Sequence, residues 1–314
     1  MPEGDTIFRS ARAPHQAFAG KTVTRFETAY APLASVNDQS PVAGRTIEQV
    51  ESRGKWLLIH FSGDLILVTH MLMSGSWHIY RVGERWKRAR SHMRVVLDTA
   101  DPQAVAFDVP VARFHTARTL QRFAGLAGLG PDLLGKGFAI DEAATRLLDR
   151  GEEEIGNVLL NQRVLAGIGN VFKSEICFVC GVNPFRRVAT LRAQEIECLL
   201  ATARRFLAAR AVSQLLWSDK DGEVWFSLEE NHEKTYRSGL HQLRNRSNVA
   251  DGAGDGIVTY TGGRRTTGSS DPAARLWVYR RMGTECRRCG ASVLMRKQGP
   301  GARSTYWCPE CQRE

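Results

Sequence analysis

The chain has 314 residues, a formal net charge of +10 at pH 7 and an isoelectric point near 9.5. This length allows two domains with cores of their own, and no apolar run approaches the roughly 18–20 residues of a membrane-spanning helix. The excess of positive charge favours a polyanionic partner, most often nucleic acid.

The N-terminus combines a potential nucleophile with an acid. The chain begins Met1-Pro2-Glu3-Gly4-Asp5, and removal of Met1 would leave a secondary amine on Pro2. An α-amine titrates near a pKa of about 8, and its neutral form can make a Schiff base with an aldehyde-level carbon. Glu3 beside it could supply a proton. Taken alone, these residues fit an ordinary N-terminus better than a catalytic one, and only residues elsewhere in the chain favour the catalytic interpretation.

Residues 2 to about 130 are predicted to form mostly strands after one helix over 5–18. Alternating or continuous apolar patterns indicate these strands, and Gly63-Asp64 is typical of a hairpin turn. The predicted strands cover residues 21–28, 46–50, 56–61, 65–68 and 93–97. Several short strands after one helix indicate a β-sandwich or barrel. The glycine-rich stretch 130–137 then reads as a linker.

Residues 138 to about 210 have helical patterns. Helices are predicted over 142–148, 155–160, 171–179 and 192–210, the last with Ile196, Leu199, Leu200 and Phe206 facing inward. A glycine-rich break at 165–170 places backbone N–H groups and the Asn170 amide at a helix N-terminus, which suits a phosphate. A plain helix–turn–helix packing element is an equal alternative. Residues 152–154 are expected to be a solvated helix start, and the polar stretch 245–273 a mobile loop.

Seven cysteines fall into two groups. Two CxxC pairs separated by 18 residues have tetrahedral zinc spacing and predict one structural zinc ion; the ligands are Cys286, Cys289, Cys308 and Cys311. The odd total argues against a full set of disulfides. Cys177 and Cys180, in a helical apolar stretch, are interpreted as buried thiols. No apolar signal segment precedes the chain, so a cytoplasmic, reducing location is expected.

Positive charge concentrates around the predicted zinc site. Residues 276–314 hold eight Lys or Arg against three acidic residues, so half of the net charge lies in these 39 residues. A small basic module of this kind usually contacts phosphates.

Four separated motifs carry a family resemblance: Pro2-Glu3-Gly4, Arg53-Gly54-Lys55, residues 166–170 followed by Ser174-Glu175, and the cysteine pairs with Arg303 between them. The chain resembles bacterial DNA glycosylases of the formamidopyrimidine-DNA glycosylase/endonuclease VIII family over nearly its whole length, with a gap at 211–275. The resemblance implies an α+β fold with an N-terminal β-sandwich and flanking helix (1–130), a linker (131–137), a helix–two-turns–helix domain (138–275) and a zinc-finger β-hairpin (276–314). It also implies a monomer that binds damaged double-stranded DNA and no membrane.

The resemblance implies a bifunctional glycosylase/AP lyase of base excision repair. The Pro2 amine would attack C1′ of the damaged nucleotide, and Glu3 would assist opening of the sugar ring. Lys55 would lie near the lesion phosphate and serve β-elimination. Arg303 would grip phosphates and serve δ-elimination.

Further binding roles follow from the same resemblance. Asn170 would bind a phosphate, and Glu175 would lie near the active centre, although a structural role for this carboxylate is equally open. Met71, Leu72 and Met73 would form a wedge that fills the gap left by the flipped base; ordinary core packing is their alternative.

The sequence motifs identify the branch of the family less clearly than they identify the family itself. Met73-Ser74-Gly75 is closer to the purine-lesion branch, but residues 108–114 lack its Arg-x-Phe-Gly arrangement. The segment 130–134 and Tyr306-Trp307-Cys308 are more similar to endonuclease VIII, although Leu72 stands where that branch often has a polar residue. Oxidised pyrimidines are therefore the favoured substrates. The alternatives are a purine-lesion glycosylase, a non-catalytic damaged-DNA-binding protein, and a zinc ribbon fused to an unrelated α+β enzyme.

Overall fold

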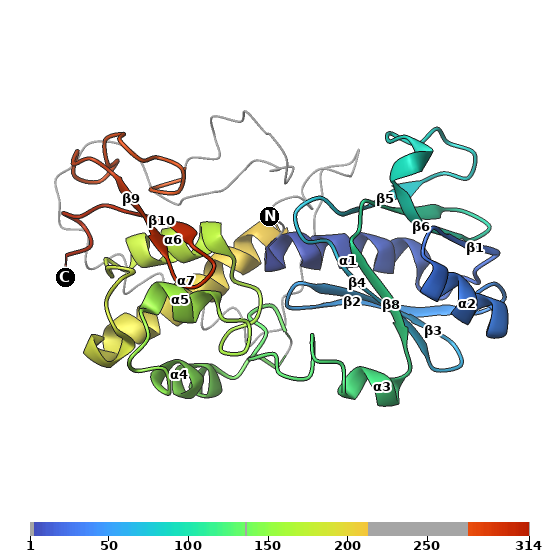
Figure 1. Ribbon diagram of the computed structural model, residues 1–314, viewed down its shortest axis with the longest axis horizontal. Coiled ribbons are helices and arrows are strands. Elements are labelled where there is room, and N and C mark those ends of the chain that lie inside the picture. The colour runs from blue at the N-terminus through green and yellow to red at the C-terminus, as the bar shows by residue number, and fades with distance from the viewer. Residues whose placement is uncertain (1–2, 136, 213–275, 314) are drawn as a thin grey trace, which may run out of the picture.

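The computed structural model describes residues 3–135, 137–212 and 276–313, and no helix in these ranges is long and apolar enough to cross a membrane. Pro2 and the predicted loop 245–273 lie outside the described residues. Figure 1 shows two lobes, with the strands β1 to β8 in one and helices α4 to α7 in the other. The hairpin β9–β10 lies on the helical lobe, and α1 starts at the junction of the lobes, where it contacts α7.

The N-terminal lobe is a β-sandwich of two four-stranded antiparallel sheets, in the orders β1-β6-β7-β5 and β2-β3-β4-β8. Its core contains side chains from both sheets, such as Leu57 of β3 and Val95 of β6, together with Phe18 of α1. The strands are β1 Arg25–Thr28, β2 Ile47–Arg53, β3 Trp56–Phe61, β4 Leu65–His70, β5 Ser76–Tyr80, β6 Met93–Asp98, β7 Gln103–Phe107 and β8 Val111–His115. The helices of this lobe are α1 Gly4–Phe18, α2 Ala31–Gln39 and α3 Ala117–Gln121.

The predicted turn between β3 and β4 is confirmed. Gly63 and Asp64 both have positive φ angles, of 76° and 55°, and the turn brings Phe61 opposite Leu65. The strand predicted over 21–28 is shorter than expected, because only Arg25–Thr28 pairs with β6, whereas Thr22 makes an isolated bridge to Thr46, the residue before β2.

The helical lobe contains α4 Ile140–Leu148, α5 Ile155–Leu160, α6 Asn170–Val179 and α7 Ala193–Val212. The four side chains predicted to face inward from the last helix are all buried: Ile196, Leu199, Leu200 and Phe206. The C-terminal strands β9 Leu294–Gln298 and β10 Arg303–Trp307 form an antiparallel hairpin that packs on α6.

One cysteine prediction is wrong. Cys180 is not a thiol: it forms a disulfide with Cys198 of α7, with the two Cα atoms 5.9 Å apart. Cys180 caps the C-terminal end of α6, so its side chain points toward the neighbouring helix, whereas Cys177 lies one turn earlier and is a buried thiol as predicted. The pairing depends on how α6 and α7 pack, and the spacing of Cys177 and Cys180 gives no information about it.

Candidate active site

The N-terminal segment enters the helical lobe through a contact between glycines. Gly4 N–H donates to the carbonyl of Gly167 at 2.8 Å. A Cβ on Gly4 would lie 2.7 Å from the Cα of Gly167, so a larger residue could not approach as closely. Gly167 has a φ of +110°, which L side chains rarely adopt. The glycine-rich break of the sequence thus serves to receive the N-terminus of the chain.

Glu3 is buried at this contact, with 4% of its surface exposed. Its carboxylate accepts hydrogen bonds from the N–H groups of Val171 (2.8 Å) and Phe172 (3.2 Å) in the first turn of α6. The backbone N–H groups that were expected to face a phosphate therefore bind Glu3 instead. A Cβ on Gly169 would lie only 2.4 Å from Cδ of Glu3, so glycine leaves the space that this carboxylate fills.

Burial is the main influence on the acidity of Glu3. Desolvation raises its pKa above the usual range, and the nearby Asp5 carboxylate adds to the effect. Lys55 and the two N–H donors act in the opposite direction. A raised pKa favours the protonated carboxyl group, which is the form that a general acid needs.

Lys55 reaches the same region from the turn between β2 and β3. Gly54 has a φ of +58° in this turn, and its N–H donates to the carboxylate of Asp132 at 2.6 Å. The ammonium of Lys55 donates to the carbonyl of Ile168 at 2.7 Å. Burial lowers the pKa of Lys55 to about 8; Glu3 opposes this shift and Arg303 adds to it. The structure therefore brings Lys55 to the loop that receives Glu3.

His70 lies within electrostatic reach of Lys55 and was not predicted as a candidate site residue. It ends β4 opposite Trp56, whose ring meets the imidazole edge-on with centroids 4.7 Å apart. Its Nδ1 accepts the N–H of Leu72 at 3.1 Å, and burial, with a smaller effect of Lys55, lowers its pKa to about 4. His70 is therefore neutral with its proton on Nε2, where it can donate to an anion. Only the pairing of β3 with β4, which places His70 opposite Trp56, could have identified His70 as a candidate.

The three predicted wedge residues separate into two kinds. Met71 belongs to the core and is 2% exposed, which fits the alternative of ordinary packing. Leu72 is 43% exposed and Met73 62% exposed. The loop turns tightly, since Leu72 has a φ of +45° and a Cβ on Gly75 would lie 2.8 Å from the carbonyl oxygen of Met71. The turn thus presents two apolar side chains to solvent.

The hairpin is attached to α6 by side chains of the helix. Asn170 Nδ2 donates to the carbonyl of Ser304 at 2.8 Å, while its buried Oδ1 accepts no hydrogen bond from the described part of the chain. Arg303 is the exposed first residue of β10. Its charge lowers the pKa of Lys55, which places the two cations within electrostatic reach of each other.

Glu175 has a structural position. Its carboxylate, 1% exposed, accepts the N–H groups of Trp277 (2.8 Å), Val278 (3.0 Å) and Tyr279 (2.9 Å). These bonds attach the segment before the cysteine pairs to α6. The structural alternative considered for Glu175 therefore fits its contacts.

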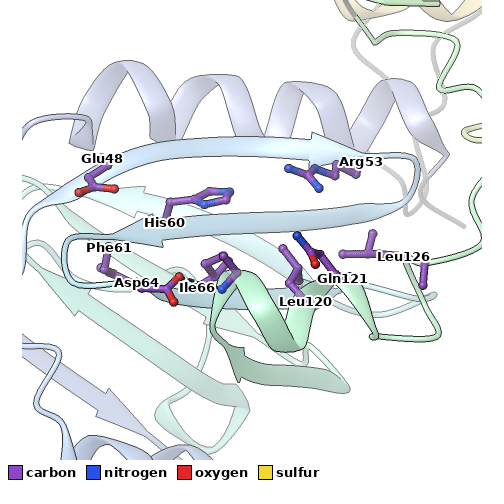
Figure 2. A pocket seen from close by; sticks show the side chains of 11 residues that line it. Glu48, Arg53, His60, Phe61, Asp64, Ile66, Leu120, Gln121 and Leu126 are labelled. Carbon is purple, nitrogen blue, oxygen red and sulfur yellow. Dashed lines mark hydrogen bonds between the residues drawn. The ribbon is translucent and has the colours of Figure 1, made fainter.

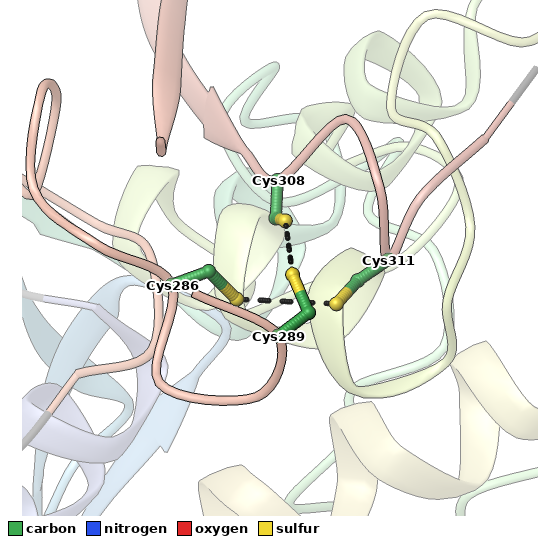
Figure 3. Close-up of side chains that lie close together, drawn as sticks. All are labelled: Cys286, Cys289, Cys308 and Cys311. Carbon is green, nitrogen blue, oxygen red and sulfur yellow. Dashed lines mark hydrogen bonds between the residues drawn. The ribbon is translucent and has the colours of Figure 1, made fainter. Parts of the chain in front are cut away.

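The four paired cysteines converge in one cluster (Figure 3). The sulfur atoms of Cys286, Cys289, Cys308 and Cys311 all lie within 4.8 Å of one another. The Sγ–Sγ distance is 3.9 Å for Cys286 and Cys311 and 3.4 Å for Cys289 and Cys308. Four thiolates at a Zn–S distance of about 2.3 Å in a tetrahedron would lie about 3.8 Å apart. The cluster therefore fits a tetrahedral metal with no open position.

A cavity of about 340 Å³ lies elsewhere, between the β2-β3-β4 strands and α3 (Figure 2). Its lining includes Arg53, His60, Asp64 and Gln121, and none of Glu3, Lys55 or Arg303. It is separate from the site described above.

Comparisons with known proteins agree with this arrangement. Residues 1–122 match the formamidopyrimidine-DNA glycosylase N-terminal domain, and residues 129–215 match the formamidopyrimidine-DNA glycosylase H2TH domain. The chain is 36% identical to "Probable endonuclease 8 2" of Streptomyces coelicolor, covering 99% of this chain and 94% of that protein. It is 34% identical to "DNA-(apurinic or apyrimidinic site) lyase Nei2" of Mycolicibacterium smegmatis, covering 99% of each.

Solved structures give the same fold. Lactococcus lactis Fpg, in a complex with DNA that contains an abasic site, aligns with a TM-score of 0.71 and 20% identity over 99% of this chain and 100% of that one. At this identity the likeness establishes the fold alone.

Proposed function

The chain belongs to the formamidopyrimidine-DNA glycosylase/endonuclease VIII family of DNA glycosylases and AP lyases, and from that premise we propose that it excises oxidised pyrimidines from double-stranded DNA through a Schiff base on Pro2. The observation that carries the proposal is the position of Glu3. A buried carboxyl group of raised pKa is covalently attached to the proposed nucleophile and lies beside Lys55. The proposal requires removal of Met1, because the nitrogen of Pro2 is otherwise an amide.

In the first step, the neutral Pro2 amine attacks C1′ of the flipped nucleotide, and the base leaves with the electrons of the glycosidic bond and takes up the proton that the amine loses. Glu3 donates its proton to the ring oxygen O4′ as the C1′–O4′ bond breaks, which yields the iminium of the open sugar. Binding of the Glu3 carboxylate by Val171 and Phe172 keeps the acid on one side of the reacting sugar.

In the elimination steps, a proton leaves C2′ and the C3′–O bond breaks, which releases the 3′ phosphate. A second elimination removes a proton from C4′ and breaks the C5′–O bond, which releases the 5′ phosphate. Lys55, Arg303 and the Nε2–H of His70 would hold the phosphates around the lesion, because the first two are cations and the third is a neutral donor. The Oδ1 of Asn170 and the oxygens of a phosphodiester are both acceptors, so this residue would contact a phosphate through its Nδ2 group.

The substrate class rests on relatedness and on the exposed loop. The relatives at 36% and 34% identity are named as endonuclease 8 and Nei2 proteins, which favours pyrimidine lesions. Leu72 and Met73 would enter the space of the extruded base, since exposed apolar side chains can replace lost stacking. A purine-lesion glycosylase remains the second candidate, because Met73-Ser74-Gly75 resembles that branch.

The other proposed components follow from the charge and the cysteine cluster. Damaged duplex DNA would be the partner of a monomer, in agreement with the charge of +10 and with the DNA in the complexes of Lactococcus lactis Fpg. One structural zinc ion would fill the cysteine cluster and hold the hairpin, with no part in the chemistry.

Borohydride trapping tests the proposal. The mature protein is incubated with duplexes that carry an oxidised pyrimidine, 8-oxoguanine or no lesion, and the covalent complex is measured. We expect strong trapping on the oxidised pyrimidine, weaker trapping on 8-oxoguanine and none on intact DNA. Preferential trapping on 8-oxoguanine would favour the second candidate. Base release without any trapping would exclude the Schiff base.

A further inference from the structure

Lys173 is a buried lysine that the proposed chemistry does not use. It lies in α6, one turn after Asn170, and has no exposed surface. Its Nζ donates to the hydroxyl of Thr305 in β10 and, at 3.4 Å, to Oε1 of Gln298 in β9. None of the ion pairs between described residues includes it. Burying an ammonium group without a carboxylate partner is costly, so its neutral hydrogen-bond partners must be well placed.

The partners of Lys173 are fully hydrogen-bonded. Gln298 Oε1 also accepts the hydroxyl proton of Thr305 at 2.7 Å, which leaves the lone pairs of that hydroxyl facing Lys173. Gln298 Nε2 donates to the carboxylate of Glu154 at 2.9 Å and to the carbonyl of Pro184 at 2.8 Å. The arrangement thus requires a donor at the position of the Lys173 ammonium. An apolar side chain of equal volume would leave the Thr305 oxygen without one.

The same stretch of α6 carries the hairpin and the catalytic acid. Val171 and Phe172 bind the Glu3 carboxylate with their backbone N–H groups. Asn170 and Lys173, on either side of them, bind the consecutive β10 residues Ser304 and Thr305 with their side chains. Arg303 is the residue immediately before Ser304 in that strand. One helical turn therefore sets the distance between the acid and the arginine.

We infer that Lys173 is a positioning residue that fixes β10 on α6 and thereby places Arg303 relative to Glu3 and Lys55. This inference rests on the proposed function, since it assigns Lys173 to the placement of a phosphate-binding arginine. The electrostatic effect of Arg303 on both Lys173 and Lys55 agrees with such proximity. The inference requires that Lys173 act through Arg303 and not directly on DNA.

A double-mutant cycle tests this requirement. Lys173→Met, Arg303→Ala and the double variant are compared with the unchanged protein on DNA that contains a preformed abasic site, with kcat, KM and the share of δ-elimination product as readouts. Lys173→Met should retain its zinc, raise KM and lower the δ-elimination share about as much as Arg303→Ala does. In the Arg303→Ala background it should change either quantity by less than about twofold, because coupled residues are not additive.

Two further variants distinguish the loss of this hydrogen bond from a general folding defect. Thr305→Val keeps the volume of the side chain but removes the acceptor of Lys173, and it should reproduce the KM and product changes. Lys21→Met, which removes an exposed lysine that binds the carbonyl of Asp101 in the N-terminal lobe, should leave both unchanged. If Lys173→Met does not fold, Thr305→Val decides the question in the same cycle.

Additive losses in the double variant would overturn the inference, as would normal KM and products in a folded Lys173→Met or Thr305→Val. Borohydride trapping by the unchanged protein separates this failure from that of the proposed function. If the unchanged protein is not trapped on abasic DNA, the Schiff-base proposal fails. If it is trapped and the cycle is additive, only the role of Lys173 fails.

Discussion

Glu3 and Val171 are 168 residues apart in the chain, yet the carboxylate of the first accepts a hydrogen bond of 2.8 Å from the backbone N–H of the second. The contact places an acid from the strand-rich lobe on the first turn of α6 in the helical lobe. The helix N-terminus stabilises the carboxylate form, while burial has the larger, opposite effect on its pKa. The acid is therefore held in place by α6 while burial raises its pKa.

Replacing Gly169 with alanine should displace this acid. The added Cβ would overlap the Glu3 side chain, whose Cδ would lie 2.4 Å away. The three atoms nearest to the added Cβ all belong to the Glu3 side chain, so the fold should survive while Glu3 moves. We expect base excision to fall by about 10²- to 10⁴-fold, the usual contribution of a general acid. Gly137→Ala is the matched control, since a Cβ there meets nothing within 4 Å. Normal excision by Gly169→Ala would show that base excision does not need the Glu3 carboxyl group in this position.

Changing Glu3 to glutamine should separate the two reactions. The amide keeps the size of the carboxyl group but cannot protonate O4′, so excision of a damaged base should stop. A preformed abasic site opens its sugar spontaneously and should still be trapped and cleaved. Equal loss of excision and abasic-site cleavage, measured on the two substrates, would indicate that Glu3 is structural.

DNA binding should depend on pH through Lys55. The pKa of Lys55 is about 8 in the free protein, and a bound phosphate raises it because the phosphate favours the ammonium. The contribution of Lys55 to affinity is therefore complete below pH 8 and declines as the pH rises, by up to about tenfold per unit. Affinity measured from pH 7 to 9.5 checks this. Lys55→Met should bind more weakly with a flatter profile.

A control is needed because burial lowers the pKa of Lys173 to about 8 as well. Lys173→Met should keep the pH dependence that Lys55 confers. If Lys173→Met loses the dependence and Lys55→Met retains it, the titrating group is Lys173.

Several residues of the candidate site could be predicted from the sequence because they lie in short motifs. Pro2 and Glu3 are neighbours, and the cysteine pairs have their spacing within one hairpin. The binding position of the Glu3 side chain could not be predicted from the sequence, because it depends on contacts between the N-terminus and the turn at Gly167 and Gly169. The expectation of a phosphate at that turn was reasonable from the backbone donors, but an internal carboxylate takes them.

The conformation of the loop at residues 71–73 could not be predicted from its side chains. Met71, Leu72 and Met73 have the same apolar character, and only the backbone decides which of them reach solvent. The positive φ of Leu72 turns the chain, so that Met71 enters the core and its two neighbours do not. Strand β7 was not predicted from the sequence. Its buried residues include Ala104 and Ala106, and alanine gives a weak strand pattern.

Removing the charge of Arg303 should weaken DNA binding without loss of metal. Arg303→Ala deletes a charge-assisted phosphate contact worth on the order of 1.5–3 kcal/mol. It should also lower the salt slope of binding by about one and slow excision and the second elimination. Arg313→Ala, at an exposed arginine paired with Glu310, is the control and should bind normally. Unchanged affinity and products in Arg303→Ala would make the hairpin a structural cap.

The cysteine cluster should determine whether the hairpin folds at all. The core of this module is small and consists of Phe178, Val278, Cys286, Val293 and Cys308. Bound zinc supplies most of the folding free energy of so small a unit, so Cys308→Ser should unfold β9–β10 locally and release Arg303 and Thr305. The sandwich core of the N-terminal lobe shares no residue with this module and should keep its thermal transition. Metal analysis, limited proteolysis and salt-dependent DNA binding measure the three consequences. A protease-resistant hairpin in metal-free protein would contradict this prediction, because the four thiols would then not need an ion to hold them together.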